Sequence, residues 1–233
     1  MKRIDSILAN SGICSRREAR RIIASGRVLA DGRKVVSASE KVDESSVITL
    51  DGKDINTEKY IYLMMNKPSG YVCSSEGEDS VLRLVPDGLY RKGLFTVGRL
   101  DKDTEGLLLI TNDGEFGHSV ASPKKEITKV YFASLEREVT DEDISAFASG
   151  LISGNGDTFL PARLEKAEGR TAYVTVSEGK YHEVKRLFLI TGNRVLRLKR
   201  VRTGGLSLDP ALEPGGTREI TSEEKALIFE GKQ

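Results

Sequence analysis

The chain has 233 residues and a formal net charge of +1, and this length allows one or two domains with hydrophobic cores. It contains no run of about eighteen apolar residues, which excludes a membrane-spanning helix, and its first residues lack the apolar stretch of a secretory signal. Because there are only two cysteines, we expect no disulfide framework and a cytoplasmic setting.

Positive charge gathers in two segments of this near-neutral chain. Residues 1–34 hold nine Lys and Arg residues against three acids, and residues 180–202 hold eight against one. We refer to these segments as the N-terminal and the C-terminal basic cluster. Charge that is concentrated in this way indicates directed contact with a polyanion.

Residues 1–57 have the pattern of a small helix–hairpin module. Ser15 and Glu18 form a capping box that predicts the start of a helix, and Gly26 is placed to end it. Asp31-Gly32 predicts a tight hairpin turn. Arginines spread around the helix, and since they repel one another unless an anion is nearby, they favour a binding face over a merely solvated one: Arg16, Arg17, Arg20 and Arg21.

The polar stretch from Lys53 to Glu58 predicts a linker, so that a second domain covers residues 59–233. Strand patterns over 60–65, 107–110, 129–135, 171–176 and 194–201 are interspersed with helical patterns. Because these elements do not alternate strictly as βαβ units, we expect an α+β fold whose sheet is mixed and mostly antiparallel, with flanking helices.

The stretch from Gly98 to Gly114 combines charge with unusual backbone freedom. Asp101 lies in an acidic loop between Gly98 and Gly106, and glycine allows a backbone to approach a ligand closely. The apolar run 107–110 that follows indicates a buried strand. On composition alone, a charged surface loop is the simpler interpretation, since an aspartate in a loop is usually a cap or turn residue.

The order of residues in this stretch adds a resemblance. Gly98-Arg99-Leu100-Asp101, then Thr104, Gly106 and residues 111–114, resemble the active-site signature of the pseudouridine synthases. The match is closest to the branch that modifies ribosomal RNA and carries an N-terminal RNA-binding module of the S4 type. This resemblance implies isomerisation of uridine to pseudouridine, with Asp101 as the nucleophile. The reaction requires no redox step, phosphate donor or metal, and we expect no cofactor and no metal ion.

Two further motifs supply partners for Asp101. In the family, a Lys-x-Tyr strand provides a tyrosine that stacks on the target base, and Tyr131 matches it. A third motif places a basic residue where Lys185 lies, and a carboxylate nucleophile in a dry pocket needs such a cation to stay ionised. Arg99 matches an arginine that takes part in extruding the nucleotide. We expect these residues at the substrate and the flipped base: Arg99, Leu100 and Val184.

The N-terminal module is similar to the S4 domain through Ser-Arg-Arg-Glu-Ala-Arg-Arg at residues 15–21. This similarity implies that its arginines lie towards RNA phosphates, contacts that position a protein without reading sequence. The partner that we expect is ribosomal RNA or a pre-ribosomal small-subunit particle, bound by a monomer without a membrane. The expected RNA-binding residues are Arg16, Arg17, Arg20, Arg27, Arg186, Arg197 and Lys199.

The Tyr181-to-Lys185 stretch resembles the enzymes that act on 16S rRNA of the small subunit. Glu183 departs from that branch, where glutamine is common at this position. A large-subunit (23S) rRNA pseudouridine synthase of the same family is one alternative. A non-catalytic RNA-binding or ribosome-assembly protein is another, and intact Asp101, Tyr131 and Lys185 argue against it.

Overall fold

The structure is a computed structural model that describes residues 1–43, 45–55, 57–58 and 60–230. Its chain divides into two compact units, the first made of Met1–Ile61 and Asp87–Leu94 and the second of Tyr62–Pro86 and Phe95–Gln233. Asn56 and Lys59, in the predicted linker and at the predicted domain start, lie outside the described residues. Within the ranges that are described, no helix has the length and apolar composition that a membrane crossing requires.

The first unit packs two helices against short strands. The helices are α1 (Ile4–Asn10) and α2 (Arg16–Ala24), and the core between them and the strands contains Ile4, Leu8, Ala19 and Ile23. β1 (Lys2–Arg3) pairs with β4 (Lys41–Val42). A four-stranded sheet has the order β3 (Arg33–Lys34), β2 (Val28–Ala30), β5 (Ile48–Leu50) and β6 (Lys53–Asp54).

Local sequence signals determine the ends of these elements. The Ser15 hydroxyl accepts a hydrogen bond from the Glu18 amide at 3.2 Å, and the Ser15 amide donates to the Glu18 carboxylate at 2.7 Å. Asp31 and Gly32 both have positive φ angles, 48° and 77°, as the primed hairpin turn requires. The predicted capping box and hairpin turn are therefore both present.

The segment Asp87–Leu94 belongs to the first compact unit, although the sequence boundary assigns it to the second domain. Its backbone packs against the turn after α1, where a Cβ on Gly12 would lie 2.7 Å from the Lys92 amide nitrogen. Leu94 and Arg91 are buried. This contact joins residues far apart in the chain, and no sequence pattern near either segment predicts it.

The second unit is built on one mixed sheet. The strand order is β13 (Arg163–Lys166), β14 (Thr171–Val176), β10 (Lys129–Leu135), β15 (Val195–Thr203), β9 (Glu105–Thr111), β7 (Tyr62–Lys67) and β17 (Thr217–Glu219). β16 (Leu206–Ser207) pairs with β15, and β8 (Phe95–Val97) pairs with β9. Only β9 and β15 pair in parallel among the described strands. The sheet is therefore mixed and mostly antiparallel, as predicted.

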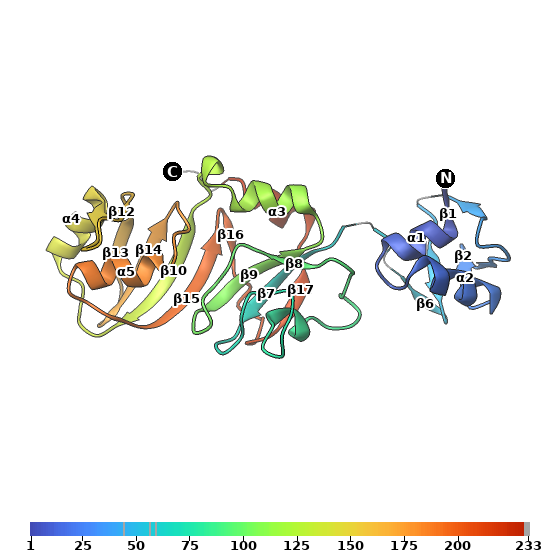
Figure 1. The fold of residues 1–233 in the computed structure, drawn as a ribbon, viewed down its shortest axis with the longest axis horizontal. Coiled ribbons are helices and arrows are strands. Elements are labelled where there is room, and N and C mark those ends of the chain that lie inside the picture. The colour runs from blue at the N-terminus through green and yellow to red at the C-terminus, as the bar shows by residue number, and fades with distance from the viewer. Residues whose placement is uncertain (44, 56, 59, 231–233) are drawn as a thin grey trace. The chain divides into compact units, whose positions relative to one another are not determined.

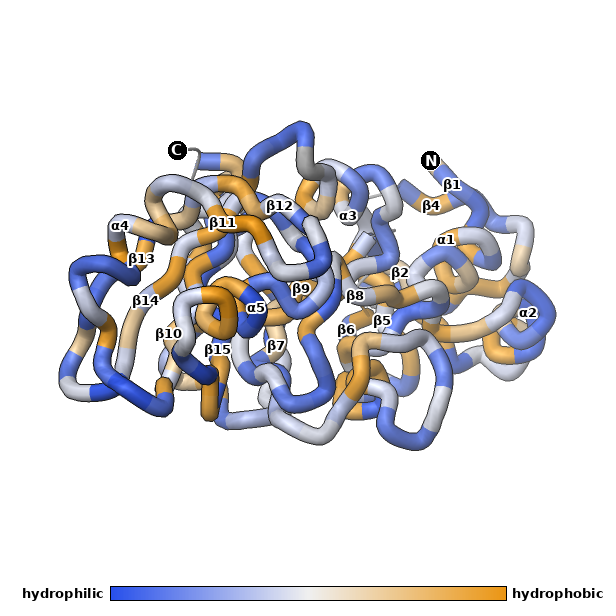
Figure 2. The backbone as a smooth tube through the Cα atoms, turned by 60° about the vertical axis from the view of Figure 1, so that its left-hand side comes forward, coloured by the Kyte–Doolittle hydropathy of each residue, from blue (hydrophilic) through white to orange (hydrophobic). Residues whose placement is uncertain are grey.

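Helices flank this sheet in two groups, one at each end (Figure 1). α4 (Asp141–Ser149) and α5 (Glu183–Ile190) share a core with β10, β13 and β14, in which Phe147 and Phe188 pack with ring centroids 5.0 Å apart. α3 (Gly114–Ala121) packs with β8 and β9 in a second core. The remaining elements are α6 (Ser222–Leu227), the hairpin β11 (Leu151–Ile152) with β12 (Thr158–Phe159), and the 3-10 turns η1 (Val81–Leu84) and η2 (Pro123–Lys125). Figure 2 shows hydrophobic segments running along the strands.

The two ends of the sheet meet where β9 crosses β15. Only two residue pairs join these strands, Lys199 with Glu105 and Arg200 with Gly106. Gly106 has a φ of 101°, and a Cβ there would lie 2.2 Å from the Arg200 carbonyl oxygen. A side chain at position 106 would push the strands apart, so this glycine is required for the close approach.

Candidate active site

The loop between β8 and β9 carries Asp101 to the junction of the sheet. The Thr104 amide donates to the Asp101 carbonyl at 3.1 Å and closes a turn around the aspartate. The Leu100 amide donates to the Cys73 sulfur at 3.4 Å. These contacts fix the backbone on both sides of Asp101.

A buried lysine at the end of β7 forms hydrogen bonds to the backbone of the same loop. The Lys67 side chain is fully buried at the end of β7, and its ammonium donates to the carbonyl oxygens of Pro68 at 3.0 Å, Lys102 at 3.2 Å and Thr104 at 2.8 Å. Burial lowers the pKa of Lys67, and the acids nearby oppose this effect. Because three carbonyl oxygens satisfy its donors, Lys67 holds the Asp101 loop against β7.

Lys185 on α5 faces Asp101 across the junction. Its ammonium lies 3.0 Å from Asp101 Oδ2 and 2.6 Å from Asp103 Oδ1. The side chains of Lys185 and Asp101 are 24% and 27% exposed, whereas Asp103 is 72% exposed. Burial alone would lower the pKa of Lys185, but its hydrogen bonds to Asp103 and Asp101 outweigh burial and raise it. Lys185 therefore stays charged beside the Asp101 carboxyl group.

His182 approaches the other oxygen of Asp101 from the residue before α5. Its Nε2 lies 3.4 Å from Asp101 Oδ1, and its backbone is left-handed, with φ 49° and ψ 33°. A non-glycine residue in this region is strained, and such strain persists only where surrounding contacts impose it. The Tyr181 ring stacks on His182 with centroids 3.8 Å apart. The turn into α5 thus directs two side chains, His182 and Lys185, at one carboxylate.

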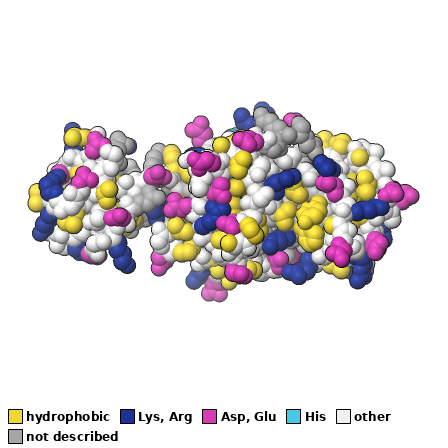
Figure 3. Space-filling view, turned by 180° about the vertical axis from the view of Figure 1, so that it is seen from behind, with side chains coloured by type: hydrophobic (Ala, Val, Ile, Leu, Met, Phe, Trp, Pro, Cys, Tyr) yellow, Lys and Arg dark blue, Asp and Glu magenta, His cyan; other side chains and the backbone are white. Residues whose placement is uncertain are grey.

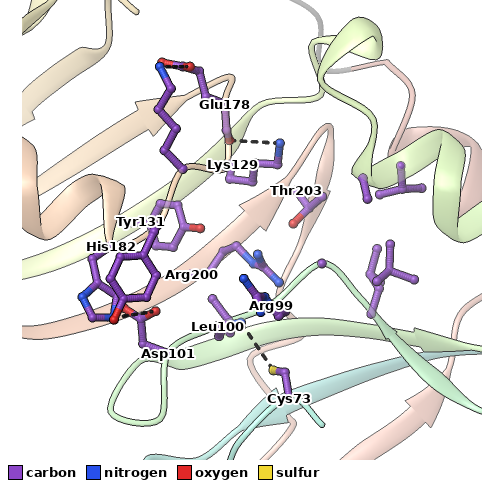
Figure 4. A pocket seen from close by; sticks show the side chains of 18 of the residues that line it. Cys73, Arg99, Leu100, Asp101, Lys129, Tyr131, Glu178, His182, Arg200 and Thr203 are labelled. Atoms are coloured by element: carbon purple, nitrogen blue, oxygen red, sulfur yellow. Dashed lines mark hydrogen bonds and ion pairs between the residues drawn. The ribbon is translucent and has the colours of Figure 1, made fainter. Parts of the chain in front are cut away.

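Asp101 borders a cavity of about 490 Å³ at the sheet junction. Tyr131 on β10 and Arg200 on β15 stand opposite each other in the strand register and both line this cavity, together with Arg99 and Lys129 (Figure 4). Leu100 and Val184 are buried and line a smaller cavity of about 70 Å³ with Asp101, Tyr131 and Lys185. All the predicted catalytic and substrate residues therefore gather around Asp101.

Glu183, in the first turn of α5, also lines the smaller cavity. Its side chain is buried and accepts a hydrogen bond from the Lys180 amide at 3.2 Å. Burial, reinforced by the negative charge of Glu178, raises the pKa of Glu183 to about 7. Burial and the charge of Arg200 lower the pKa of Lys129, which donates to the Glu178 carbonyl at 3.3 Å. A carboxyl group with a raised pKa thus lies at the smaller cavity.

The predicted RNA-binding residues fall into different settings. Arg16, Arg17 and Arg20 are exposed on α2, and Arg27 pairs with Asp51 at 2.7 Å. Arg186 pairs with Asp157 and its guanidinium lies 4.7 Å above the Phe159 ring. Arg197 lies 3.4 Å from Glu105. Lys199 lines a separate groove on the opposite face of the sheet. None of these side chains lines the cavity that contains Asp101.

Three residues of the site were not assigned by the sequence analysis. Lys67 follows a run of buried strand residues, and a lysine there is the one signal that could have marked it. His182 lies inside the motif that contains Lys185, but no spacing rule indicates its left-handed backbone. Arg200 was one of many cations in the C-terminal basic cluster, and only the strand register shows that it lines the cavity.

The arrangement supports chemistry by a carboxylate. Asp101 lies beside Lys185 and His182, and it borders a cavity that is lined by an aromatic ring and two arginines. A carboxylate in such a position can attack an anomeric carbon. The aromatic ring can stack on a base, and Arg99 and Arg200 can hold an anionic group.

The chain is similar to known proteins along almost its whole length. A sequence model of the RNA pseudouridylate synthase family matches residues 61–193, and a model of the S4 domain matches residues 2–48. The RNA pseudouridine synthase YtzG of Bacillus subtilis is 42% identical over 98% of both chains. Ribosomal small subunit pseudouridine synthase A of Escherichia coli is 39% identical over 97% of this chain and 99% of its own. A crystal structure of a pseudouridylate synthase, 33% identical, superposes with a TM-score of 0.68 over 98% of this chain and all of the other.

Proposed function

The chain belongs to the RNA pseudouridylate synthase family, and on that premise we propose that it converts one uridine of 16S ribosomal RNA to pseudouridine, with Asp101 as nucleophile. The enzyme acts on RNA and carries an S4 domain. The single observation that supports Asp101 most strongly is its pairing with Lys185 at 3.0 Å on the border of the cavity lined by Tyr131 and Arg99.

The proposed reaction moves one bond and one proton. The Asp101 carboxylate attacks C1′ of the target ribose, and the bond from C1′ to N1 of uracil breaks. The freed uracil turns, its C5 forms the new bond to C1′, and Asp101 leaves as a carboxylate. N1 gains a proton and C5 loses one, so the reaction needs no outside reductant or oxidant.

In the proposed reaction, each of the residues around Asp101 has a separate role. Lys185 keeps Asp101 ionised and stabilises it when it leaves. Tyr131 stacks on the uracil, and its hydroxyl relays the C5 proton, releasing its own proton as it accepts that one. Arg99 holds the extruded nucleotide, which must leave its stack to reach the cavity. Leu100 and Val184 provide the apolar wall that keeps water from the carboxylate.

The choice of the small subunit rests on the relatives. The Escherichia coli relative is named for the small ribosomal subunit and matches almost the whole chain. We propose 16S rRNA of the small subunit as the substrate here, with a target uridine of the uridine-516 type that the resemblance of the Tyr181-to-Lys185 stretch implies, bound as rRNA or as a pre-ribosomal particle. The proposed enzyme is a cytoplasmic monomer, and the exposed arginines of α2 contact RNA phosphates.

Mapping pseudouridine in the rRNA of cells that lack this protein tests the proposal. We expect the loss of one pseudouridine in 16S rRNA and its return when the wild-type gene is restored, but not when the Asp101→Asn variant is supplied. Loss from 23S rRNA instead would contradict the small-subunit assignment. Unchanged 16S and 23S maps would contradict modification of either RNA.

A further inference from the structure

The sheet of the second unit has a second face that its helices leave open. Strand alternation directs Tyr131 and Ala133 of β10 towards the catalytic cavity and the α4–α5 core, and it directs Val130 and Phe132 to the other side. A groove of about 520 Å³ lies on this other side, over β10, β14 and β15. None of the helices in the described part of the chain contributes a residue to its lining.

Aromatic rings form the floor beside this groove. Tyr173 on β14 lines it and is 41% exposed. Phe132 on β10 stands opposite Tyr173, with ring centroids 5.1 Å apart. Figure 3 shows this face of the molecule, with hydrophobic side chains gathered among Lys and Arg side chains. Exposed rings on an open sheet are a platform on which nucleobases stack.

The charged side chains around the rings leave an excess of positive charge. Each of the two acids of the groove has an arginine partner, Glu165 with Arg163 at 2.8 Å and Asp209 with Arg218 at 2.6 Å, and Arg218 is shared with Glu224 at 2.7 Å. Lys199 and Arg202 also line the groove, and within the described residues neither has an ion-pair partner. The groove therefore complements an anionic ligand that presents flat rings.

The strand register explains why two cations reach this face. Lys199 stands opposite Phe132, in the row that continues to Tyr173. A register shift between Val130 and Tyr131 places Arg202 opposite Val130, so that Val201 and Arg202 both line the groove. A bulge of this kind redirects one side chain to the other face. The cations and the rings are thus held on adjacent strands.

We propose that this rear groove binds a single-stranded segment of RNA, with bases on Tyr173 and Phe132 and phosphates on Lys199 and Arg202. The enzyme acts on RNA, so the same molecule would reach both faces of the sheet when its substrate extends beyond the target nucleotide. The inference concerns a surface apart from the cavity of Asp101 and does not depend on which rRNA is modified.

The test measures binding of the full chain to an oligouridylate of about 16 nucleotides, the upper site size of single-strand grooves. Replacing Lys199 and Arg202 by alanine should reduce the slope of log affinity against log salt by about 1.4, roughly 0.7 for each lost phosphate contact. The charge-preserving double variant Lys199→Arg with Arg202→Lys should keep the wild-type slope. Thermal unfolding of each variant establishes that the fold is intact.

The rings are tested separately. Tyr173→Ala should raise the Kd for the oligouridylate on the order of tenfold, and Tyr173→Phe should leave it near the wild-type value. With 4-thiouridine in the oligonucleotide, irradiation should crosslink it to the peptide that contains Tyr173. An unchanged salt slope together with an unchanged Kd would overturn the proposal.

Two experimental outcomes distinguish RNA binding in this groove from protein binding there and from the proposed role of Asp101. If the variants bind the oligouridylate normally but no longer co-sediment with small-subunit particles, the groove binds a protein, and the RNA proposal is wrong. The binding assay requires no turnover, and so Asp101→Asn should show the wild-type slope whether or not Asp101 is the nucleophile. The proposal for the rear groove and the proposal for Asp101 can therefore be contradicted independently of each other.

Discussion

The two basic clusters have similar charge in the sequence but different roles in the fold. In the N-terminal cluster, a helix displays Arg16, Arg17 and Arg20 to solvent around one side. In the C-terminal cluster, a strand separates neighbouring cations: Arg200 is buried at the sheet junction, while Lys199 and Arg202 line the rear groove. The charges of this helix can therefore be counted together on its exposed side, but the charges of a strand must first be divided between its two faces.

The first turns of α2 and α5 each contain one glutamate, and the two glutamates differ in burial and in pKa. Glu18 is exposed in its capping box, and its hydrogen bonds to Ser15 lower its pKa. Glu183 is buried, and its pKa rises to about 7. The same residue type, at the start of an arginine-bearing helix, is thus stabilised as an anion in one unit and as a neutral acid in the other.

The largest effect is expected at Arg200. Its Nε donates to the Leu107 carbonyl at 2.7 Å, and the side chain is buried between β15 and β9. Arg200→Ala should lower the free energy of unfolding by about 3 kcal/mol, because a buried carbonyl loses its charged partner. Urea unfolding measures this change. Arg202→Ala on the same strand is the control and should change stability by about 0.5 kcal/mol or less. Equal losses of stability in the two variants would contradict the assignment of Arg200 to the buried face of β15 and of Arg202 to the open face.

The arginines of α2 should affect RNA binding and hardly affect stability. Replacing Arg16, Arg17 and Arg20 by alanine should weaken rRNA binding on the order of a hundredfold at low salt, and should reduce the salt slope by roughly 0.7 to 0.9 per arginine. Alanine is the better helix former, so α2 should persist. Fluorescence anisotropy across a salt series gives the slopes of the triple variant and of the wild type. A triple variant with the wild-type slope would mean that this helix face is only solvated.

Glu183 should make stability depend on pH. Its folded pKa of about 7 lies above the unfolded value of 4.5, so the folded state holds the proton more tightly. Stability from this group is complete below pH 4.5 and is lost as pH rises to about 7. Glu183→Gln should therefore be more stable than wild type by about 2 kcal/mol at pH 8, with the gap closing towards pH 4.5. Urea unfolding at both pH values tests this, and parallel curves would exclude a raised pKa.

The smallest effect concerns the start of α2. Ser15→Ala removes the acceptor for the Glu18 amide and should lower the stability of the first unit by about 1 kcal/mol. Ser15→Asp keeps an acceptor at the same position and should lose much less. Thermal unfolding followed by circular dichroism compares the two. If both variants unfold like the wild type, the capping box does not stabilise the arginine helix.

Local features of the fold could be predicted because neighbours in sequence create them. The Ser15–Glu18 box and the Asp31-Gly32 turn follow from side chains within three residues. The mixed sheet followed from the irregular order of strand and helix patterns. The packing of Asp87–Leu94 in the first unit could not be predicted from the sequence, because its contacts with the turn at Gly12 join segments that are far apart in the chain.

The site shows the same limit. A motif in the sequence pointed to Asp101, Tyr131 and Lys185, and the fold brings them to one cavity. The support around them is tertiary: Lys67 reaches carbonyl oxygens 35 and 37 positions away along the chain. The position of Arg200 depends on a strand register that no local pattern determines. Sequence patterns thus identify reacting groups more readily than the residues that hold them.

The measurement that tests the central claim most directly is tritium release from 5-tritiated uridine in a 16S rRNA fragment, comparing Asp101→Asn with Asp103→Asn. Both aspartates pair with Lys185, but Asp103 is largely exposed and does not line the cavity. We predict that Asp101→Asn abolishes release while its RNA affinity stays within a few-fold of wild type, and that Asp103→Asn retains most of the activity. Release by Asp101→Asn at about a tenth of the wild-type rate or more, a loss of only about 1.4 kcal/mol in transition-state stabilisation, would contradict its role as nucleophile.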